Sequence, residues 1–155
     1  MQMGINGSDI AGSPGLDLFV IKVLDGLGDY DYEEALEFVL STKGVLTSTA
    51  PENQNSDHLS PVQNVPGIVA VGHTHVPSAS GNRRETRARE LPGPGDHVPL
   101  ERWSVPNYIR TPEGHIRVLE RINGVFRVRT VRGTDANRQD RWKPGKCNSR
   151  GECSF

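Results

Sequence analysis

A stretch of ten residues that ends in two histidines constrains this chain more than any other part of its sequence. It reads Gly-Ile-Val-Ala-Val-Gly-His-Thr-His-Val over residues 67–76. Its short apolar run, preceded by a proline and rich in β-branched residues, is typical of a buried strand. Because alternate residues of a strand face the same side, His73 and His75 should share one face and Thr74 should point to the other. Two imidazoles at the end of a buried strand indicate a metal site.

The composition sets the class of fold around this strand. The chain has 155 residues, enough for one domain with a core, and its 17 glycines and 11 prolines indicate many turns. These counts predict an α+β or mostly β domain with irregular connections. From these counts together with the elements described below, we expect an α+β fold with a mixed β-sheet, an N-terminal helix and long loops. No apolar run reaches the roughly 18 residues of a membrane span. The N-terminus lacks the basic and apolar regions of a secretory signal.

Charge is divided unevenly along the chain. Residues 1–60 carry ten acidic side chains against two lysines, and residues 61–155 carry nine against sixteen basic side chains. Halves of opposite sign attract each other in a folded domain, and an arginine-rich face can also meet an acidic partner or nucleic acid. These arginines alternate with apolar residues, as on a solvated strand face. Nucleic acid is therefore the weaker alternative.

The first half of the chain predicts a helix followed by a hairpin. A flexible leader or linker over residues 1–15 precedes a helix over Leu16–Leu27, where the apolar residues come close to helical spacing. Residues 31–40 begin like a helical turn and end like a strand. That strand should pair in a hairpin with a second strand over residues 45–49.

The second half predicts a long loop and then a meander. Residues 77–95 have no predicted element, and a loop of that length is usually functional or disordered. Residues 108–132 predict three strands separated by Pro-Glu-Gly and Asn-Gly turns. Few apolar residues other than Trp142 follow, so we expect a metal-binding domain over residues 16–132 and a loosely packed tail over residues 133–155.

Two cysteines lie in that tail. Five residues separate Cys147 from Cys153. This spacing is compatible with a small disulfide loop in an oxidising compartment and with two free thiols in a reducing one.

Zinc suits two histidine nitrogens and one carboxylate oxygen, with a fourth tetrahedral position left for water. Asp96, in Leu-Pro-Gly-Pro-Gly-Asp-His, is the expected third ligand. His73, His75 and Asp96 would thus bind one Zn²⁺ per chain. Water acidified by zinc also needs a carboxylate that accepts its proton. Three upstream glutamates are available for that role: Glu33, Glu34 and Glu37.

Three motifs follow one another: His-Thr-His after an apolar strand, then Pro-Gly-Asp, then Pro-Asn-Tyr-Ile-Arg-Thr-Pro-Glu-Gly-His-Ile-Arg-Val. In this order they resemble the JAB/MPN (JAMM) metalloprotease domain, above all its divergent bacterial branch at the C-termini of Rhs-type polymorphic toxins. The resemblance covers about residues 37–128. It implies a zinc-dependent metallopeptidase or isopeptidase acting on a protein or peptide. His73, His75 and Asp96 would be the ligands and Glu37 the general base.

The same resemblance carries expectations about context. It implies a toxin (effector) domain that is secreted or delivered as part of a larger bacterial protein, together with a neutralising immunity protein. Without such delivery the chain is expected in the cytoplasm.

The chain departs from the family pattern at two positions. Gly93 stands where the family has a serine that helps to stabilise the oxyanion, and Val76 separates the second histidine from Pro77. In other enzymes the loss of such a hydrogen bond costs about 3 kcal/mol of transition-state stabilisation. Ser78, Ser80 or a backbone amide are the available substitutes in the substrate region.

Three other functions remain open. A JAB-like domain with weak or absent catalysis would be a binding module, which is consistent with Gly93. The segment Gly-His-Thr-His-Val-Pro also resembles the last metal-binding segment of calcineurin-like metallophosphoesterases, although that family's Asp-x-His and Gly-Asn-His motifs do not occur upstream. A nuclease-like hydrolase that used the basic half of the chain would bind nucleic acid in a salt-sensitive way.

Overall fold

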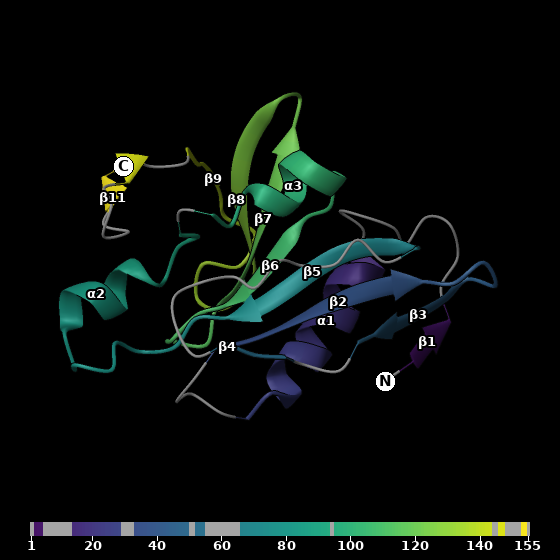
Figure 1. The fold of residues 1–155 in the computed structure, drawn as a ribbon, viewed down its shortest axis with the longest axis horizontal. Helices are drawn as coiled ribbons and strands as arrows, with labels where there is room; N and C mark the ends of the chain where they lie inside the picture. The colour runs from purple at the N-terminus through teal and green to yellow at the C-terminus, as the bar shows by residue number, and fades with distance from the viewer. Residues whose placement is uncertain are drawn as a thin grey trace.

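The computed structural model shows an α+β fold built on one mixed β-sheet (Figure 1). It describes residues 2–4, 14–28, 33–49, 52–54, 66–93, 95–143, 146–147 and 153–154. The helices are α1 (Pro14–Gly26), α2 (Arg83–Ala88) and α3 (Val98–Trp103). The strands are β1 (Gln2–Gly4), β2 (Glu33–Leu40), β3 (Val45–Ser48), β4 (Glu52–Gln54), β5 (Ile68–Thr74), β6 (Asn107–Arg110), β7 (Ile116–Ile122), β8 (Val125–Arg132), β9 (Gln139–Arg141), β10 (Lys146–Cys147) and β11 (Cys153–Ser154).

The large sheet has the strand order β1-β3-β2-β5-β6-β7-β8-β9, and β4 pairs with β2. β5 lies between β2, to which it is antiparallel, and β6, to which it is parallel. A parallel pair requires a crossover connection. Here that connection runs over residues 75–106 and contains α2 and α3. It returns the chain to the side of β5, where its last residue, Pro106, accepts a hydrogen bond from the Val71 amide.

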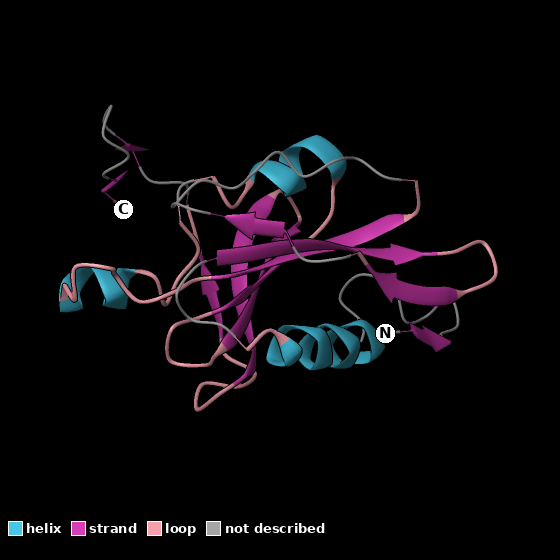
Figure 2. Ribbon diagram, turned by 60° about the horizontal axis from the view of Figure 1, so that its bottom comes forward, coloured by secondary structure: helices cyan, strands magenta, loops and turns pink. Residues whose placement is uncertain are grey.

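One face of the sheet is covered by α1, and α3 lies on the other face (Figure 2). Gly72 of β5 lies beneath α1, because a Cβ added there would be 2.9 Å from the Phe38 ring and 3.5 Å from Leu24. Since neighbouring strand residues face opposite sides, His73 points away from α1. The core on the α1 face is a cluster of buried side chains: Leu16, Phe19, Val20, Leu24, Leu36, Phe38, Leu46, Ala70, Tyr108, Ile116 and Val118.

Polar contacts hold α1 at a fixed place on the sheet. The Tyr108 hydroxyl donates a hydrogen bond to Asp17 at 2.5 Å, and Arg129 donates to the same carboxylate at 2.7 Å. Burial and the nearby Asp17 charge raise the pKa of the Tyr108 phenol, so the hydroxyl stays protonated. At the other end of the helix, the buried Arg110 guanidinium donates to the carbonyl oxygen of Leu24 at 2.8 Å. This contact satisfies a carbonyl of the last helical turn.

The expected coarse class, an α+β fold with a mixed sheet and an N-terminal helix, is confirmed. The helix predicted over Leu16–Leu27 is α1, and the predicted hairpin is β2 with β3. The predicted central strand is β5, and the predicted meander is β6 to β8. Helical spacing, β-branched runs and turn residues were sufficient signals for these elements, because each of these signals is local in the sequence.

Two expectations about the chain are corrected. Residues 33–35 do not form a helical turn but belong to β2, because that segment pairs with β4 on one side and with β5 on the other. The segment 77–95 is not without structure, since it contains α2. Asn82 caps this helix by accepting hydrogen bonds from the amides of Arg84 and Glu85. The short helix α3 was not predicted.

The C-terminal segment takes part in the fold over residues 139–142. β9 pairs with β8, and the Trp142 side chain is buried against Leu100, Leu119 and Val128. β10 and β11 pair with Cys147 opposite Cys153. The side chains of these cysteines lie outside the described part, as does most of the leader over residues 1–15, so the disulfide and the leader stay predictions. Among the described residues, no helix combines the length and apolarity needed to cross a membrane.

Candidate metal centre

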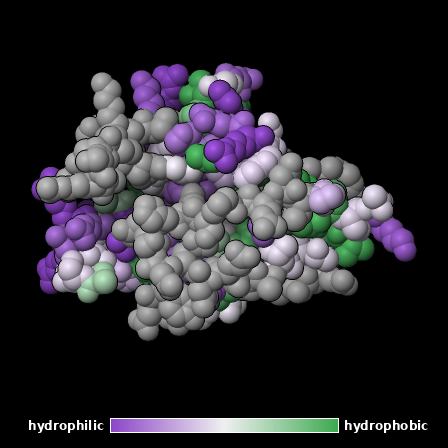
Figure 3. Space-filling model, viewed as in Figure 1, coloured by the Kyte–Doolittle hydropathy of each residue, from purple (hydrophilic) through white to green (hydrophobic). Residues whose placement is uncertain are grey.

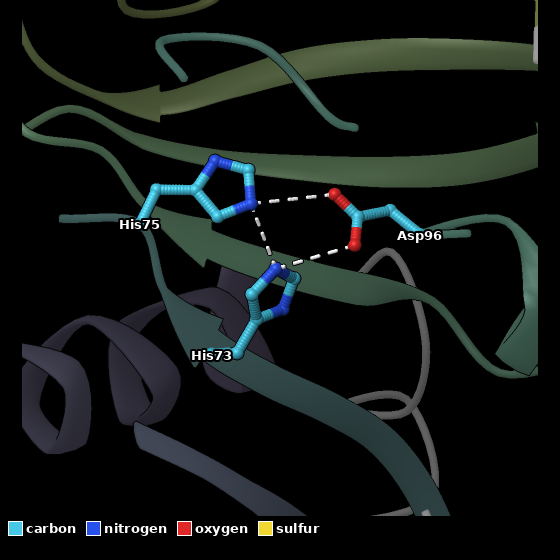
Figure 4. Close-up of side chains that lie close together, drawn as sticks. All are labelled: His73, His75 and Asp96. Atoms are coloured by element: carbon cyan, nitrogen blue, oxygen red, sulfur yellow. Dashed lines mark hydrogen bonds and ion pairs between the residues drawn. The ribbon is translucent and has the colours of Figure 1, made fainter. Parts of the chain in front are cut away.

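Three buried side chains converge on one point beyond the end of β5 (Figure 4). The Nε2 atoms of His73 and His75 lie 3.0 Å apart. Asp96 places Oδ1 3.3 Å from Nε2 of His73 and Oδ2 3.4 Å from Nε2 of His75. All three residues are buried, with exposed fractions of 2%, 7% and 4% respectively. The structure thus brings together the three residues that the sequence predicted as ligands.

Each of these side chains is placed by a different piece of the fold. His73 belongs to β5, and His75 follows the strand directly, where its amide still donates to the carbonyl of Arg110 at 2.8 Å. Asp96 comes from the far end of the crossover, in a turn after Gly95, whose φ of +134° is readily adopted by glycine. The site therefore forms only when the crossover closes over the sheet.

Hydrogen bonds set the tautomers of both histidines. Asn107 donates from Nδ2 to the Asp96 carbonyl at 3.0 Å, so its Oδ1 faces Nδ1 of His73 at 3.1 Å and accepts from it. Nδ1 of His75 lies 2.8 Å from the carbonyl oxygen of Arg89, which can only accept. Both imidazoles therefore carry their proton on Nδ1 when neutral. Each Nε2 then presents a lone pair toward the other and toward the carboxylate.

The electrostatics of the three groups favour a cation between them. Burial alone would raise the pKa of the Asp96 carboxyl, but His73 and His75 hold that pKa well below its usual range. Burial alone would lower the pKa of His75, but Asp96, Glu33 and the Arg89 carbonyl raise it to about 8. In the metal-free chain, the proton that His75 gains thus compensates the negative charge of the Asp96 carboxylate near neutral pH. A divalent cation can take the place of that proton.

The donor set and its spacing fit a small divalent metal. Ligands about 2.0–2.1 Å from a tetrahedral zinc lie about 3.3 Å from one another. The three donor separations here are 3.0, 3.3 and 3.4 Å. The Nδ1 partners Asn107 and Arg89 are of the kind that orients metal-binding imidazoles.

The loop that carries Asp96 is anchored at several points. The Gly93 amide donates to Oδ2 of Asp96 at 2.6 Å. Further back, Trp142 donates from Nε1 to the Pro92 carbonyl at 3.3 Å, and Arg117 donates from Nε to the Glu90 carbonyl at 2.7 Å. Residues of β7 and of the C-terminal segment therefore help to position the loop that carries Asp96.

A second group, Glu90, Glu113 and His115, also brings possible ligand atoms together. Its atoms are already engaged, however. The Glu90 carboxylate accepts from the Glu113 amide at 2.8 Å and lies 3.0 Å from Nδ1 of His115, while Nε2 of His115 lies 3.3 Å from the Thr134 hydroxyl. This group fixes the start of the Asp96 loop.

The three glutamates considered as the general base lie in different environments. Glu37 accepts a hydrogen bond from the Thr49 hydroxyl at 2.7 Å and lies opposite Val71. Glu34 belongs to the other face, where its amide donates to the Thr74 hydroxyl. Glu33 is buried, shares the face of His73, and contributes to the raised pKa of His75. Among the three glutamates, Glu33 is therefore the one whose charge acts on His75, whereas Glu37 is held by Thr49.

The residues expected in the substrate region serve as structural contacts. The Ser78 hydroxyl donates to Glu85 at 2.6 Å and lies 2.9 Å from the Ser80 hydroxyl, so both serines fasten the start of α2. At Gly93 the backbone amide contacts the ligand Asp96, and an added Cβ would have Oδ2 of Asp96 at 3.7 Å as its nearest neighbour. A serine side chain therefore fits at this position.

Asn107, Arg89 and Trp142 are the residues that sequence reasoning missed as parts of the site. Asn107 opens β6 and lies opposite Val71, which places its amide diagonal to His73 on the same face. A polar residue at the start of the strand was the signal available. Its meaning depends on the parallel pairing of β5 with β6, which local periodicity does not reveal.

Comparison of the chain with protein-family models, with curated protein sequences and with solved structures gave no match. The fold and this constellation of side chains therefore carry the functional argument.

Proposed function

We propose that this chain is a zinc-dependent metallopeptidase or isopeptidase with a JAB/MPN-like fold. The observation that carries the proposal is the convergence of two Nε2 lone pairs and one carboxylate in a buried site, each held by a partner that fixes its orientation. Two histidines, one carboxylate and a fourth position for water form a donor set typical of catalytic rather than structural zinc.

The residues of the chain divide the work as follows. His73, His75 and Asp96 would hold the ion, which supplies Lewis acidity and makes water acidic near neutral pH. Glu33 would accept a proton from such a water, because it is the upstream glutamate whose charge acts on His75. Asn107 and the Arg89 carbonyl accept from the Nδ1 atoms, so the Nε2 atoms of the neutral imidazoles would face the ion.

The resemblance to the bacterial toxin branch extends this proposal to the biological context. A protein or peptide is the proposed substrate, and the chain would act as the effector part of a larger delivered protein with an immunity protein as its partner. The mixed sheet, with the histidine strand antiparallel to a preceding hairpin strand, is compatible with that family.

Metal content by elemental mass spectrometry tests the site. We expect about one zinc per chain in the wild type and loss of the metal in His75→Ala and Asp96→Ala. Two metals per chain would favour the metallophosphoesterase alternative. A wild type free of metal after refolding with excess zinc would refute the proposal.

Peptidase assays of two matched variants test the base. Glu33→Gln should keep the zinc and lose activity, whereas Glu37→Gln, four residues further along the same face of β2, should stay active because Glu37 is bound by Thr49. The reverse result would return the role to Glu37.

A binding module is the second candidate, and Gly93 is the observation that favours it. Gly93→Ser restores the hydroxyl of the family pattern at a position with room for it. If the chain is an enzyme, this change should raise kcat by up to about 100-fold with the metal retained. Zinc-loaded wild type and Gly93→Ser that both lack peptidase activity would identify a binding module.

A further inference from the structure

A strongly basic surface lies on α2, beside the metal centre. Arg83, Arg84 and Arg87 are exposed there, and we call these three side chains the α2 arginine face. At about 100° per residue, these positions fall within an arc of about 100° around the helix axis. In Figure 1 α2 lies at the left edge of the molecule, and the same region is hydrophilic in Figure 3.

α2 is tied directly to the metal ligands. Arg89 directly follows α2, and its carbonyl oxygen accepts a hydrogen bond from Nδ1 of His75. Its guanidinium donates a hydrogen bond to the Val76 carbonyl at 2.9 Å. At the start of the helix, the Ser78 amide donates to the Thr86 hydroxyl at 2.9 Å. The arginine face therefore has a fixed position relative to the site.

The charges of this face are not balanced within the part of the chain that the structure describes. Glu85, the acidic residue of α2, is turned toward Ser78, and no ion pair joins the three arginines to a described carboxylate. Arg83 and Arg87 are four residues apart on one helix, a like-charge spacing that destabilises the helix. An anionic ligand would relieve this repulsion.

We propose that the α2 arginine face binds acidic side chains of the polypeptide substrate, so that the metal centre acts on acidic segments. This inference rests on the proposed function. Guanidinium groups bind carboxylates through paired hydrogen bonds. Leu91, which is 51% exposed and lies between α2 and the Asp96 loop, offers an apolar contact beside them. Residues 77–95 contain no aromatic side chain, so the surface lacks the stacking platform of a single-stranded nucleic-acid site.

Fluorescence anisotropy of the full chain tests the inference. The probes are a short labelled peptide with glutamates and aspartates around a leucine, and the same peptide with glutamines and asparagines. The wild type should bind the acidic peptide more tightly, and added salt should weaken that binding. The triple variant Arg83→Gln/Arg84→Gln/Arg87→Gln should bind it about tenfold more weakly.

A matched control removes the same charge elsewhere. Arg121→Gln/Arg141→Gln/Lys143→Gln changes three exposed basic residues on β7, β9 and the segment after β9. Both triples should keep the wild-type circular dichroism spectrum and metal content, and the control should bind the peptide like the wild type. If both triple variants bound the acidic peptide equally weakly, the loss would reflect net charge alone, and the inference would be overturned. Tighter binding of a single-stranded oligonucleotide than of the acidic peptide would overturn it as well.

The inference and the proposed function fail in different ways. Peptide binding requires no turnover, so a metal-free chain whose acidic-peptide binding depends on α2 would refute the proposed function alone. A zinc-loaded, active chain whose α2 triple binds like the wild type would refute the inference alone. In an active chain, the α2 triple should raise KM for the acidic peptide and leave kcat unchanged.

Discussion

At the scale of single residues, Asn107 makes hydrogen bonds to two of the proposed metal ligands. One amide group holds the Nδ1 atom of His73 and the backbone of Asp96 at the same time. Because the side chain is fully buried, neither partner can turn to water when the amide is removed. Asn107 therefore couples a ligand on β5 to a ligand in the crossover.

Replacing Asn107 by alanine should weaken zinc binding by about 10–100-fold, the usual effect of losing a partner of a metal-binding histidine. Competition with a chelator of known affinity measures this change. Gln139→Ala, which removes an exposed amide on β9, is the control and should leave the affinity unchanged. Equal affinities in the wild type and Asn107→Ala would show that Asn107 does not support the site.

The protonation of His75 makes the stability of the metal-free chain depend on pH. The pKa of His75 is raised from 6.5 to about 8 in the folded state. A raised pKa means that the stabilisation is complete below the unfolded-state pKa and is lost as the pH rises through the folded-state pKa. Unfolding by denaturant with a chelator present should thus give a free energy about 2 kcal/mol lower at pH 9 than at pH 6.

His75→Gln provides the control for that measurement, since it removes the titrating group. The difference between pH 6 and pH 9 should shrink in this variant. A wild type whose unfolding free energy is the same at both pH values would show that the buried imidazole does not gain a proton in the metal-free chain.

At the scale of elements, the contact between β5 and α1 leaves no room for a side chain at Gly72. A Cβ there would meet the Phe38 ring at 2.9 Å and Leu24 at 3.5 Å. This close approach fixes which face of β5 meets the helix and so which face receives the histidines. The elements with strong signals in neighbouring residues were predicted well, because helical spacing, β-branched runs and turn residues are local properties.

Gly72→Ala should therefore lower the free energy of unfolding by about 1–3 kcal/mol through overpacking. Thermal or denaturant unfolding measures the loss. Gly28→Ala is the matched control, because a Cβ at that position has no neighbour within 4 Å. Unchanged stability of Gly72→Ala would mean that α1 does not pack on β5 as closely as described.

The elements that were predicted wrongly depend on long-range contacts. Glu33 and Glu34 favour a helix, yet both belong to β2 because this segment has a partner strand on each side. The helix α2 has no buried residue and thus no apolar face from which to predict it. Its stability comes from the Asn82 cap and from the contacts of Ser78 and Arg89.

At the scale of the whole molecule, the acidic first half of the sequence and the basic second half meet in ion pairs. Asp17 of α1 binds Arg129 of β8 at 2.7 Å, and Asp25 at the end of α1 pairs with Arg132. The attraction expected between the two halves thus takes place between the helix and the sheet that it covers. The Asp17 pair is the more buried of the two.

Asp17→Ala should lower the free energy of unfolding by about 1–3 kcal/mol, because it leaves the buried Tyr108 hydroxyl without its acceptor and leaves Arg129 paired with Glu120 alone. Asp25→Ala, which breaks the exposed pair, should cost less than about 1 kcal/mol. Denaturant unfolding of both variants compares them directly. Equal losses would show that burial of the Asp17 network adds no stability.

The sequence alone determined the parts of the site that depend on local order. A β-branched run predicted the strand, strand alternation placed both histidines on one face, and metal chemistry pointed to Asp96. Only the tertiary structure decided which glutamate lies near the site, which nitrogen of each imidazole is free, and which residues anchor the Asp96 loop. The physical reason is that alternation acts between neighbouring residues, whereas Glu33, Arg89 and Asn107 reach the site through pairings between segments far apart in the chain.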